Sequence, residues 1–460
     1  MSKIKKDENQ VEYTGRYLVL MPENVDTGIS SLGALNSISG LNLKSSTEFE
    51  NEVFTTKDLD SCDGILLENI GVAIVNKNPN FEGGIGAMTD NHNMIVEKER
   101  VVYAISKLNP DAENYINGYR DAVNVLSGML LGESETDTLV AEDEEINAES
   151  VGATWGLKST KVVPSSLIFS NPYSGLNVKV AILDTGFDFN HPDFIGRPIV
   201  QRSFIPGEAT QDRHGHGTHC TGTACGPLNP SGNFERYGIA HKSRIYIGKV
   251  LNNAGGGTDG QILAGINWAF GQGCKVINMS LGGRVNGAGF SAIYENTASN
   301  LLNRGTLIVA AAGNDSNRPN QINPVSHPAN CPSIMAVGAV DAQMNVARFS
   351  NGGLFLAYGA VDIVGPGVNV FSSISTPHSP NMGPVGIQRG NVNGTSMAAP
   401  HVSGIAALWI EAAGVTGRAL WAKLLSTAKP LPQHPVRDVG AGLVQAPNKR
   451  RLPVRWPIPF

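Results

Sequence analysis

The chain has 460 residues, of which 16% are charged, and its 53 glycines follow no three-residue period. These values exclude disordered, coiled-coil and collagen-like chains. The net charge of −5 is unevenly divided, because residues 1–150 carry −16 and residues 151–460 carry +11. We therefore expect the two parts to attract each other, whereas the scattered positive charges indicate no nucleic-acid partner.

The first 150 residues predict a small α+β unit followed by a linker. Residues 1–13 are polar and predict a disordered tail. Residues 14–132 predict a β-α-β-β-α-β sheet, a ferredoxin-like arrangement with one helical face, and a further helix after it. Residues 133–150 contain eight acidic residues, which is typical of an exposed, cleavable linker. The expected elements are strands at 16–21, 41–49, 64–76 and 101–105 and helices at 29–37 and 110–132.

From residue 178 onwards, continuous apolar runs rich in β-branched residues alternate with glycine-punctuated helices. Continuous runs indicate strands that are buried on both faces. Residues 151–447 therefore predict an α/β fold, a mainly parallel sheet with helices on both faces. Residues 448–460 form a basic, proline-rich tail. The expected strands lie at 178–183, 245–250, 276–279, 306–310 and 334–337, and two of the helices at 261–271 and 397–410.

Targeting and redox signals are sparse. No window holds about 18 uninterrupted apolar residues, so we expect no membrane-spanning helix. The N-terminus has a basic start without an apolar core, unlike a conventional secretory signal. Five cysteines are an odd and sparse set, which predicts no disulfide framework. We therefore expect a cytoplasmic protein, with export by another route left open.

Two segments near the first strand of the expected parallel sheet carry candidate catalytic residues. Asp184 ends the run VAILDTG, and open α/β sheets place functional groups at the carboxyl ends of their strands. Taken alone, Asp184 fits equally well as a cap of the turn at Gly186. His216 lies in DRHGHGTHCTGT, whose three histidines and Cys220, with Cys225 just after it, also suggest a metal site. Because zinc ligands usually come as pairs on separate elements, we favour a catalytic His216 and expect no metal.

Two later segments carry a hydroxyl and an amide in positions suited to acyl transfer. Ser396 lies in NGTSMAAPHVSG and opens an apolar helix, whose positive N-terminus stabilises a developing anion. Asn314 follows a buried run and a glycine in AAAGNDS, where its amide can donate to an oxyanion. The simpler alternatives are a helix N-cap for Ser396 and an ordinary turn residue for Asn314.

Together, these segments resemble the subtilisin-like serine proteases (the subtilases, peptidase family S8), in the chain order Asp184, His216, Ser396. The resemblance covers about residues 155–447. Cys220, four residues after His216, is a feature of the proteinase K-like branch. The preceding α+β unit is similar to the inhibitory pro-domain of this family.

The resemblance implies a role for each of these residues. Ser396 is the implied nucleophile, His216 the base that takes its proton, and Asp184 the residue that orients His216. Asn314 and the backbone N–H of Ser396 are implied to form the oxyanion hole. A peptide would bind extended between two segments that contain glycine. These segments are Ser280, Leu281 and Gly282 on one side and Gly255, Gly256 and Gly257 on the other.

The resemblance also bears on metals and specificity. Asp193 corresponds to a calcium ligand of many family members. One carboxylate does not make a site of about 6–8 oxygens, so we expect no required cofactor and leave structural calcium at Asp193 open. His327 and Asp315 correspond to the first specificity pocket, and Asp259 lies near a more distant one. Cys220 is expected to be a small buried residue rather than a second nucleophile.

The predicted function is therefore that of a serine endopeptidase made as a self-inhibited zymogen. Both dedicated processing and general degradation remain open. The expected partners are a protein or peptide substrate and the protein's own N-terminal unit, and we expect a monomer with no membrane partner. The alternatives are a family member that binds without catalysis, which the complete motifs disfavour, and an esterase. The segment around Ser396 lacks the G-x-S-x-G pattern that favours an esterase.

Overall fold

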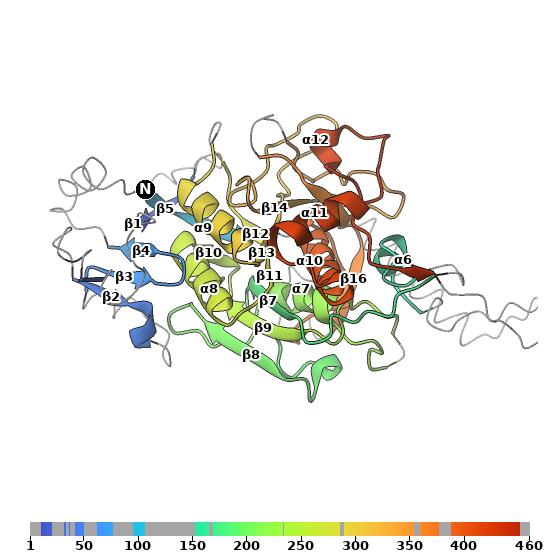
Figure 1. Ribbon diagram of the computed structural model, residues 1–460, viewed down its shortest axis with the longest axis horizontal. Helices are drawn as coiled ribbons and strands as arrows, with labels where there is room; N and C mark the ends of the chain where they lie inside the picture. Colours follow the sequence, from blue (N-terminus) through green and yellow to red (C-terminus); the bar gives the residue numbers. More distant parts are fainter. Residues whose placement is uncertain are drawn as a thin grey trace, which may run out of the picture.

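The computed structural model describes an N-terminal unit and a large unit (Figure 1). The predicted helix at 110–132, the linker at 133–150 and most of the predicted helix at 29–37 lie outside the described residues. No helix in the described part of the chain is both long and apolar enough to cross a bilayer. The described residues are 11–20, 32–33, 36, 42–49, 62–76, 95–105, 152–164, 169–232, 234–285, 289–353, 359–376 and 388–450.

The large unit is built on a seven-stranded sheet in which all neighbouring strands are parallel. The predicted apolar runs form its central strands, and their residues are buried almost throughout. The α/β fold expected from the sequence is confirmed. In spatial order the strands are β15 (Ile363–Pro366), β14 (Met335–Val340), β13 (Leu307–Ala311), β11 (Val276–Met279), β7 (Lys179–Asp184), β9 (Arg244–Lys249) and β8 (Ile199–Ser203).

Helices cover both faces of this sheet. Successive side chains of a strand point to opposite sides, so the apolar strands present an apolar surface on each face for helices to pack against. On β7, Val180 and Ile182 face a core shared with α7 (His216–Cys225), α10 (Thr395–Ala413) and α11 (Gly417–Thr427). Ala181 and Leu183 face a second core, shared with α8 (Asp259–Gly271) and α9 (Ala292–Asn303). Smaller elements are α6 (Trp155–Ser159), η2 (Pro192–Phe194), α12 (Val436–Val439), the hairpin β16 (Val370–Ser373) with β17 (Arg389–Val392), and the pair β6 (Phe169–Ser170) with β18 (Lys449–Arg450).

The described strands of the N-terminal unit form one sheet, whereas the helices of the expected β-α-β-β-α-β arrangement lie largely outside the described residues. β5 (Ile95–Ala104), β1 (Tyr13–Leu20), β4 (Val72–Val75) and β3 (Gly64–Leu67) lie side by side, and each pair of neighbours is antiparallel. Two of the predicted strands need correction.

The first of these, at 41–49, is only β2 (Leu43–Ser45), after which the chain turns into the short η1 (Ser46–Phe49). The second, at 64–76, is a hairpin and not one strand. Its turn centres on Gly71, whose φ of +65° a glycine adopts without strain.

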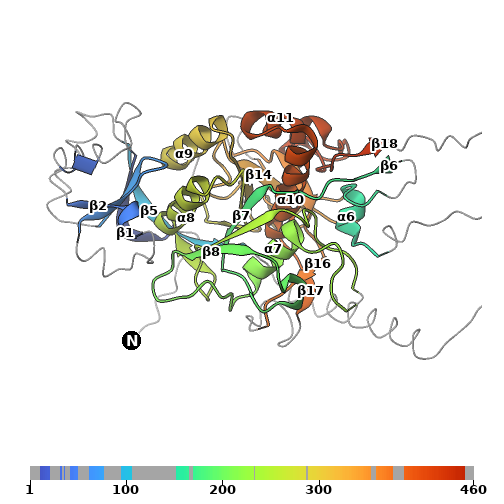
Figure 2. The ribbon, with the colours of Figure 1, turned by 60° about the horizontal axis from the view of Figure 1, so that its bottom comes forward.

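β5 connects the two units, which Figures 1 and 2 both show side by side with α8 and α9 beside the N-terminal sheet. One edge of β5 pairs with β10 (Gly256–Thr258), with Gly256 opposite Tyr103. Its other edge pairs with β12 (Leu281–Gly282), with Leu281 opposite Ala104. The C-terminal half of β5 is therefore an inserted strand between two segments of the large unit.

Two glutamates on β5 hold the N-termini of α9 and α8. Glu97 accepts hydrogen bonds from the Ser291 hydroxyl (2.6 Å) and the Ala292 amide (2.7 Å) at the start of α9. Glu99, which is fully buried, accepts from the Gly260 amide of α8 at 3.0 Å and from the Arg16 guanidinium at 2.6 Å. Carboxylates at helix N-termini satisfy free amides and oppose the helix dipole, so both contacts favour docking of the unit.

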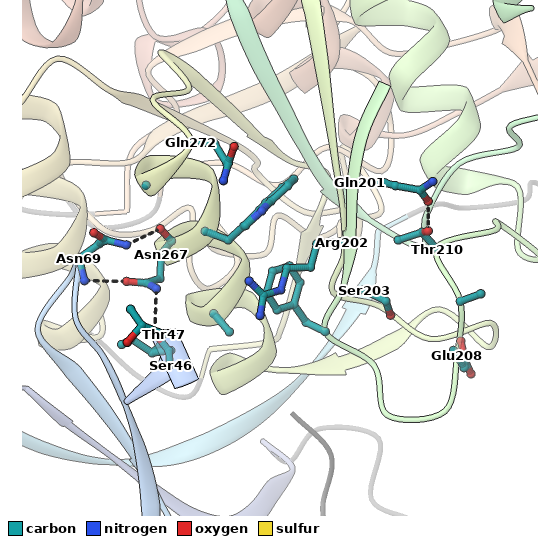
Figure 3. Close-up of a pocket in the computed structure, with 16 residues that line it drawn as sticks. Ser46, Thr47, Asn69, Gln201, Arg202, Ser203, Glu208, Thr210, Asn267 and Gln272 are labelled. Carbon is teal, nitrogen blue, oxygen red and sulfur yellow. Dashed lines mark hydrogen bonds between the residues drawn. The ribbon is translucent and has the colours of Figure 1, made fainter. Parts of the chain in front are cut away.

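A pocket of about 830 Å³ lies elsewhere on the boundary between the units (Figure 3). Its walls come from residues near η1 and β3 on one side and from β8 and α8 on the other. Beside it, the Asn267 side chain of α8 accepts from the Asn69 amide at 2.9 Å, and Arg202 donates to the Phe49 carbonyl at 2.7 Å. Polar side chains therefore join the two units here, whereas at β5 they are joined by the backbone hydrogen bonds of paired strands.

We predict that Glu99→Ala loosens β5. The variant loses a buried, charge-assisted set of hydrogen bonds, so amide exchange over residues 101–104 should accelerate about 10-fold or more. The measurement is hydrogen exchange on the full chain carrying Ser396→Ala, which removes the nucleophile expected from the sequence. Lys98→Ala, which changes an exposed neighbour on the same strand, is the matched control. Equal exchange in both variants would show that Glu99 does not hold the strand.

Candidate active site

Asp184 and His216 are in direct contact. Asp184 is the last residue of β7 and His216 the first of α7, and His216 Nδ1 lies 2.7 Å from Asp184 Oδ1. The approach of α7 requires Gly217, because a Cβ there would lie 2.2 Å from the Gly186 carbonyl oxygen. Both side chains are almost fully buried. With Nδ1 donating to the carboxylate, His216 Nε2 is left as an acceptor, and it has no hydrogen-bond partner among the described residues.

The electrostatics of His216 favour its charged form. Burial, the largest single effect, lowers the pKa of the His216 imidazole, but Asp184 and Cys220 together outweigh burial and raise this pKa well above its ordinary value. The opposite holds for His219, whose pKa burial lowers to about 3. Of the two, only His216 has a carboxylate beside it that stabilises an imidazolium.

Ser396 and Asn314 meet at one backbone carbonyl. Ser396 is the second residue of α10, and its hydroxyl donates to the Ile105 carbonyl and, at 3.1 Å, to the Ser280 carbonyl. Asn314 Nδ2 donates to the same Ile105 oxygen at 2.9 Å. Asn314 Oδ1 accepts from the Thr395 amide (2.9 Å) and hydroxyl (2.8 Å), which fixes the orientation of the amide group. The Ile105 carbonyl therefore lies between a hydroxyl and a fixed N–H donor.

The six predicted substrate-binding residues line both sides of β5. Ala104 donates to the Gly255 carbonyl at 2.8 Å, and Ile105 donates to the Ser280 carbonyl at 3.4 Å. Gly282 has to be glycine, since a Cβ there would lie 2.7 Å from the His327 carbonyl oxygen. The two sides are Gly255 with β10, which holds Gly256 and Gly257, and Ser280 with β12, which holds Leu281 and Gly282.

Other predicted residues lie around this centre with different contacts. Cys220 is fully buried, with Sγ 3.9 Å from His216 Nδ1, and burial raises the pKa of its thiol, so the reactive thiolate is disfavoured. His327 and Asp259 form a buried pair at 2.9 Å, a contact that sequence spacing does not reveal. Asp315 instead lies near the surface, 3.4 Å from Arg284. In the described part of the chain, the side chains grouped closely enough to hold a metal are Asp184, His216 and Cys220, with ligand atoms within 4.8 Å of one another.

Comparison with known proteins decides the family. The family model described as the subtilase family matches residues 175–442. The chain belongs to the subtilase family. It is 38% identical to M-protease of Shouchella clausii (strain KSM-K16) over 275 residues, 59% of this chain and 63% of that protein. It is 34% identical to subtilisin E of Bacillus subtilis (strain 168) over 296 residues, 64% of this chain and 70% of that protein. The chain thus spans slightly less than two thirds of M-protease.

The calcium position implied by the subtilase resemblance does not fit calcium in this chain. Both carboxylate oxygens of Asp193 accept from the Arg389 guanidinium, and Oδ1 also accepts from the Ser231 amide at 2.7 Å. Oδ2 accepts from the Tyr237 hydroxyl at 2.5 Å. The neighbours of Asp193 are therefore N–H and O–H donors and an organic cation, whereas calcium needs oxygen ligands. Arg389, stacked 4.5 Å above the Phe234 ring, supplies the positive charge.

We predict that this pair supports stability at neutral pH and loses its effect in acid. Burial opposes ionisation of Asp193, but the Arg389, Tyr237 and Ser231 donors lower its pKa from 3.8 to about 2. A lowered carboxyl pKa stabilises the fold above about pH 4, and this stabilisation is lost as the pH falls towards 2. Asp193→Asn should therefore cost about 2 kcal/mol at pH 7 and little at pH 2.

The measurement is urea unfolding of the Ser396→Ala chain at several pH values, with and without Asp193→Asn. Glu235→Gln changes an exposed acid between Ser231 and Tyr237 in the sequence and should have no such pH-dependent effect. A cost that is the same at pH 7 and pH 2 would contradict the assignment.

Proposed function

We propose that the chain is a serine endopeptidase that is made as a self-inhibited zymogen. The observation that carries the proposal is the position of the Ile105 carbonyl, between the Ser396 hydroxyl and the Asn314 amide. The segment that carries this carbonyl is bound as an extended strand between β10 and β12, as a peptide substrate would be. The Ile105–Ser106 bond is therefore the one presented for cleavage.

The side chains suit acyl transfer in two steps. For attack on the Ile105 carbonyl carbon, the Ser396 hydroxyl turns from the Ser280 carbonyl to His216 Nε2, which takes its proton. The negative charge that develops on the Ile105 oxygen is stabilised by Asn314 Nδ2. His216 then gives its proton to the Ser106 nitrogen as the peptide bond breaks. Water hydrolyses the resulting ester, and Asp184 keeps the imidazole in the required tautomer throughout.

The N-terminal unit acts as the inhibitor in this proposal. Backbone hydrogen bonds on both edges of β5, together with Glu97 and Glu99 at two helix ends, hold the strand in the cleft. The charges of −16 and +11 on the two parts of the chain add attraction. Cleavage in or near residues 133–150, as expected from the sequence, stays a prediction. In this scheme it follows a first cut after Ile105.

The cleft also favours a restricted set of substrates. Val102, three residues before Ile105, is fully buried, and a Cβ at Gly282 would lie 2.6 Å from Ile105 Cδ1. Tyr103, between them, is 48% exposed. We therefore propose that peptides with aliphatic residues at the first and fourth positions before the scissile bond are preferred. This preference favours dedicated processing over general degradation.

We predict that Ser396→Ala abolishes peptide hydrolysis, self-processing and reactivity with fluorophosphonate probes. Loss of the nucleophile should lower turnover on the order of 10⁶-fold. Mass spectrometry of the purified chains should find a new N-terminus at Ser106 in the wild type and an uncut Ala variant. Ser403→Ala, on the same helix, should keep probe reactivity. Peptide cleavage by the Ser396→Ala chain at a rate near that of the wild type would refute the proposed mechanism.

We also predict that Asn314→Ala lowers turnover about 100–1000-fold with little change in KM, because its amide meets full charge only in the transition state. Asn314→Asp keeps the acceptor for Thr395 and removes the donor, so it should be impaired at least as strongly. Steady-state kinetics on a short peptide separate the two parameters. A defect confined to KM would instead assign Asn314 to ground-state binding.

A further inference from the structure

A buried carboxylate that the proposed chemistry does not use lies beside the inserted strand. Asp259 follows β10 directly and lies opposite Arg100, where the register of β10 and β5 continues. Its Oδ2 accepts a hydrogen bond from the Arg100 backbone amide at 3.0 Å. Counting back from the Ile105–Ser106 bond, Arg100 is the sixth residue.

The carboxylate is held in place from its other side. Asp259 Oδ1 lies 2.9 Å from His327 Nε2, and the two residues are 2% and 0% exposed. The His327 ring packs edge-on against Tyr294 at 4.8 Å, and the Tyr294 hydroxyl donates to the Asp259 carbonyl at 3.3 Å. The backbone of His327 is bonded in both directions to Gly283. Asp259 therefore presents one oxygen to the strand position with its orientation already fixed.

Asp259 is not needed to cap its own helix, because Thr258 and Gln261 form a capping box at the start of α8. The remaining hydrogen-bonding capacity of the Asp259 side chain is directed at β5. A buried carboxylate without its donor costs free energy, so the site gains when an N–H arrives.

We propose that Asp259, oriented by His327, is a subsite for the backbone N–H of the sixth residue before the scissile bond. This inference rests on the proposed endopeptidase function and names the substrate class: peptides that extend at least six residues on that side and have a free N–H at the sixth. Because the contact is to the backbone, the sixth position accepts any residue except proline, which has no backbone N–H to donate.

The test uses peptides with the protein's own sequence and the self-processed wild-type enzyme. The first is acetyl-Arg-Val-Val-Tyr-Ala-Ile with a reporter amide, and the second is the same peptide with an N-methylated arginine nitrogen, which removes only the donor. We expect kcat/KM to be about 10-fold or more higher for the first, mainly through KM, since the contact is remote from the reacting bond. Acetyl-Val-Val-Tyr-Ala-Ile, which lacks the sixth residue, should behave like the methylated peptide.

The same two hexapeptides are then tested on the Asp259→Ala variant, which gives a double-mutant cycle between peptide and enzyme. In this variant the two hexapeptides should be cleaved equally, and because each ratio is measured within one enzyme, any loss of folded protein cancels. Equal cleavage by the wild type, or a preference that persists in Asp259→Ala, would overturn the subsite. If none of the peptides is cleaved by the wild type, the endopeptidase proposal fails instead, so the two failures are distinguishable.

Discussion

The position of a single backbone carbonyl, that of Ile105, depends on the insertion of β5 between two segments of the large unit. Backbone hydrogen bonds to Gly255 on one side and Ser280 on the other fix the height of the strand in the cleft. Neither bond depends on the side chain of the inserted strand. Under the proposed function the strand is therefore exchanged for a substrate peptide, whereas the two flanking segments cannot change without moving the carbonyl away from Asn314.

This arrangement separates how tightly the N-terminal unit binds from where it binds. The strand pairing sets the register of β5. Glu97 and Glu99 stabilise the docked unit further, because their carboxylates accept hydrogen bonds at the N-termini of α9 and α8, away from the Ile105 carbonyl. The opposite charges of the two parts act over a longer range and are screened by salt over about 10 Å at 0.1 M. Salt should thus weaken the attraction without shifting the register.

The sequence predicted the sheet well, and it singled out catalytic candidates that stay predictions, because both leave strong local signals. Strands buried on both faces are continuous apolar runs, and Asp184, His216, Asn314 and Ser396 each follow a run or open a helix. The hairpin at residues 64–76 was missed because the turn at Gly71 interrupts an apolar stretch without proline or a paired turn motif. The contact of Ile105 could not be predicted, since a backbone carbonyl makes it.

Three aspartates show why residue type alone does not assign a role. Asp184 accepts from His216 Nδ1, and His216 Nε2 has no partner among the described residues, so the carboxylate stabilises a proton taken up at Nε2. Both carboxylate oxygens of Asp193 accept hydrogen bonds from within the fold, from the Arg389 guanidinium and the Ser231 amide, so this carboxylate connects separate segments of the large unit. Asp259 has one oxygen held by His327 and one facing the inserted strand. The three carboxylates differ in whether β5 supplies one of their hydrogen-bond donors. Asp184 and Asp193 accept no hydrogen bond from β5, whereas Asp259 accepts one from the Arg100 backbone N–H. In the proposed enzyme, only Asp259 of the three is therefore left with an acceptor that a substrate peptide can fill.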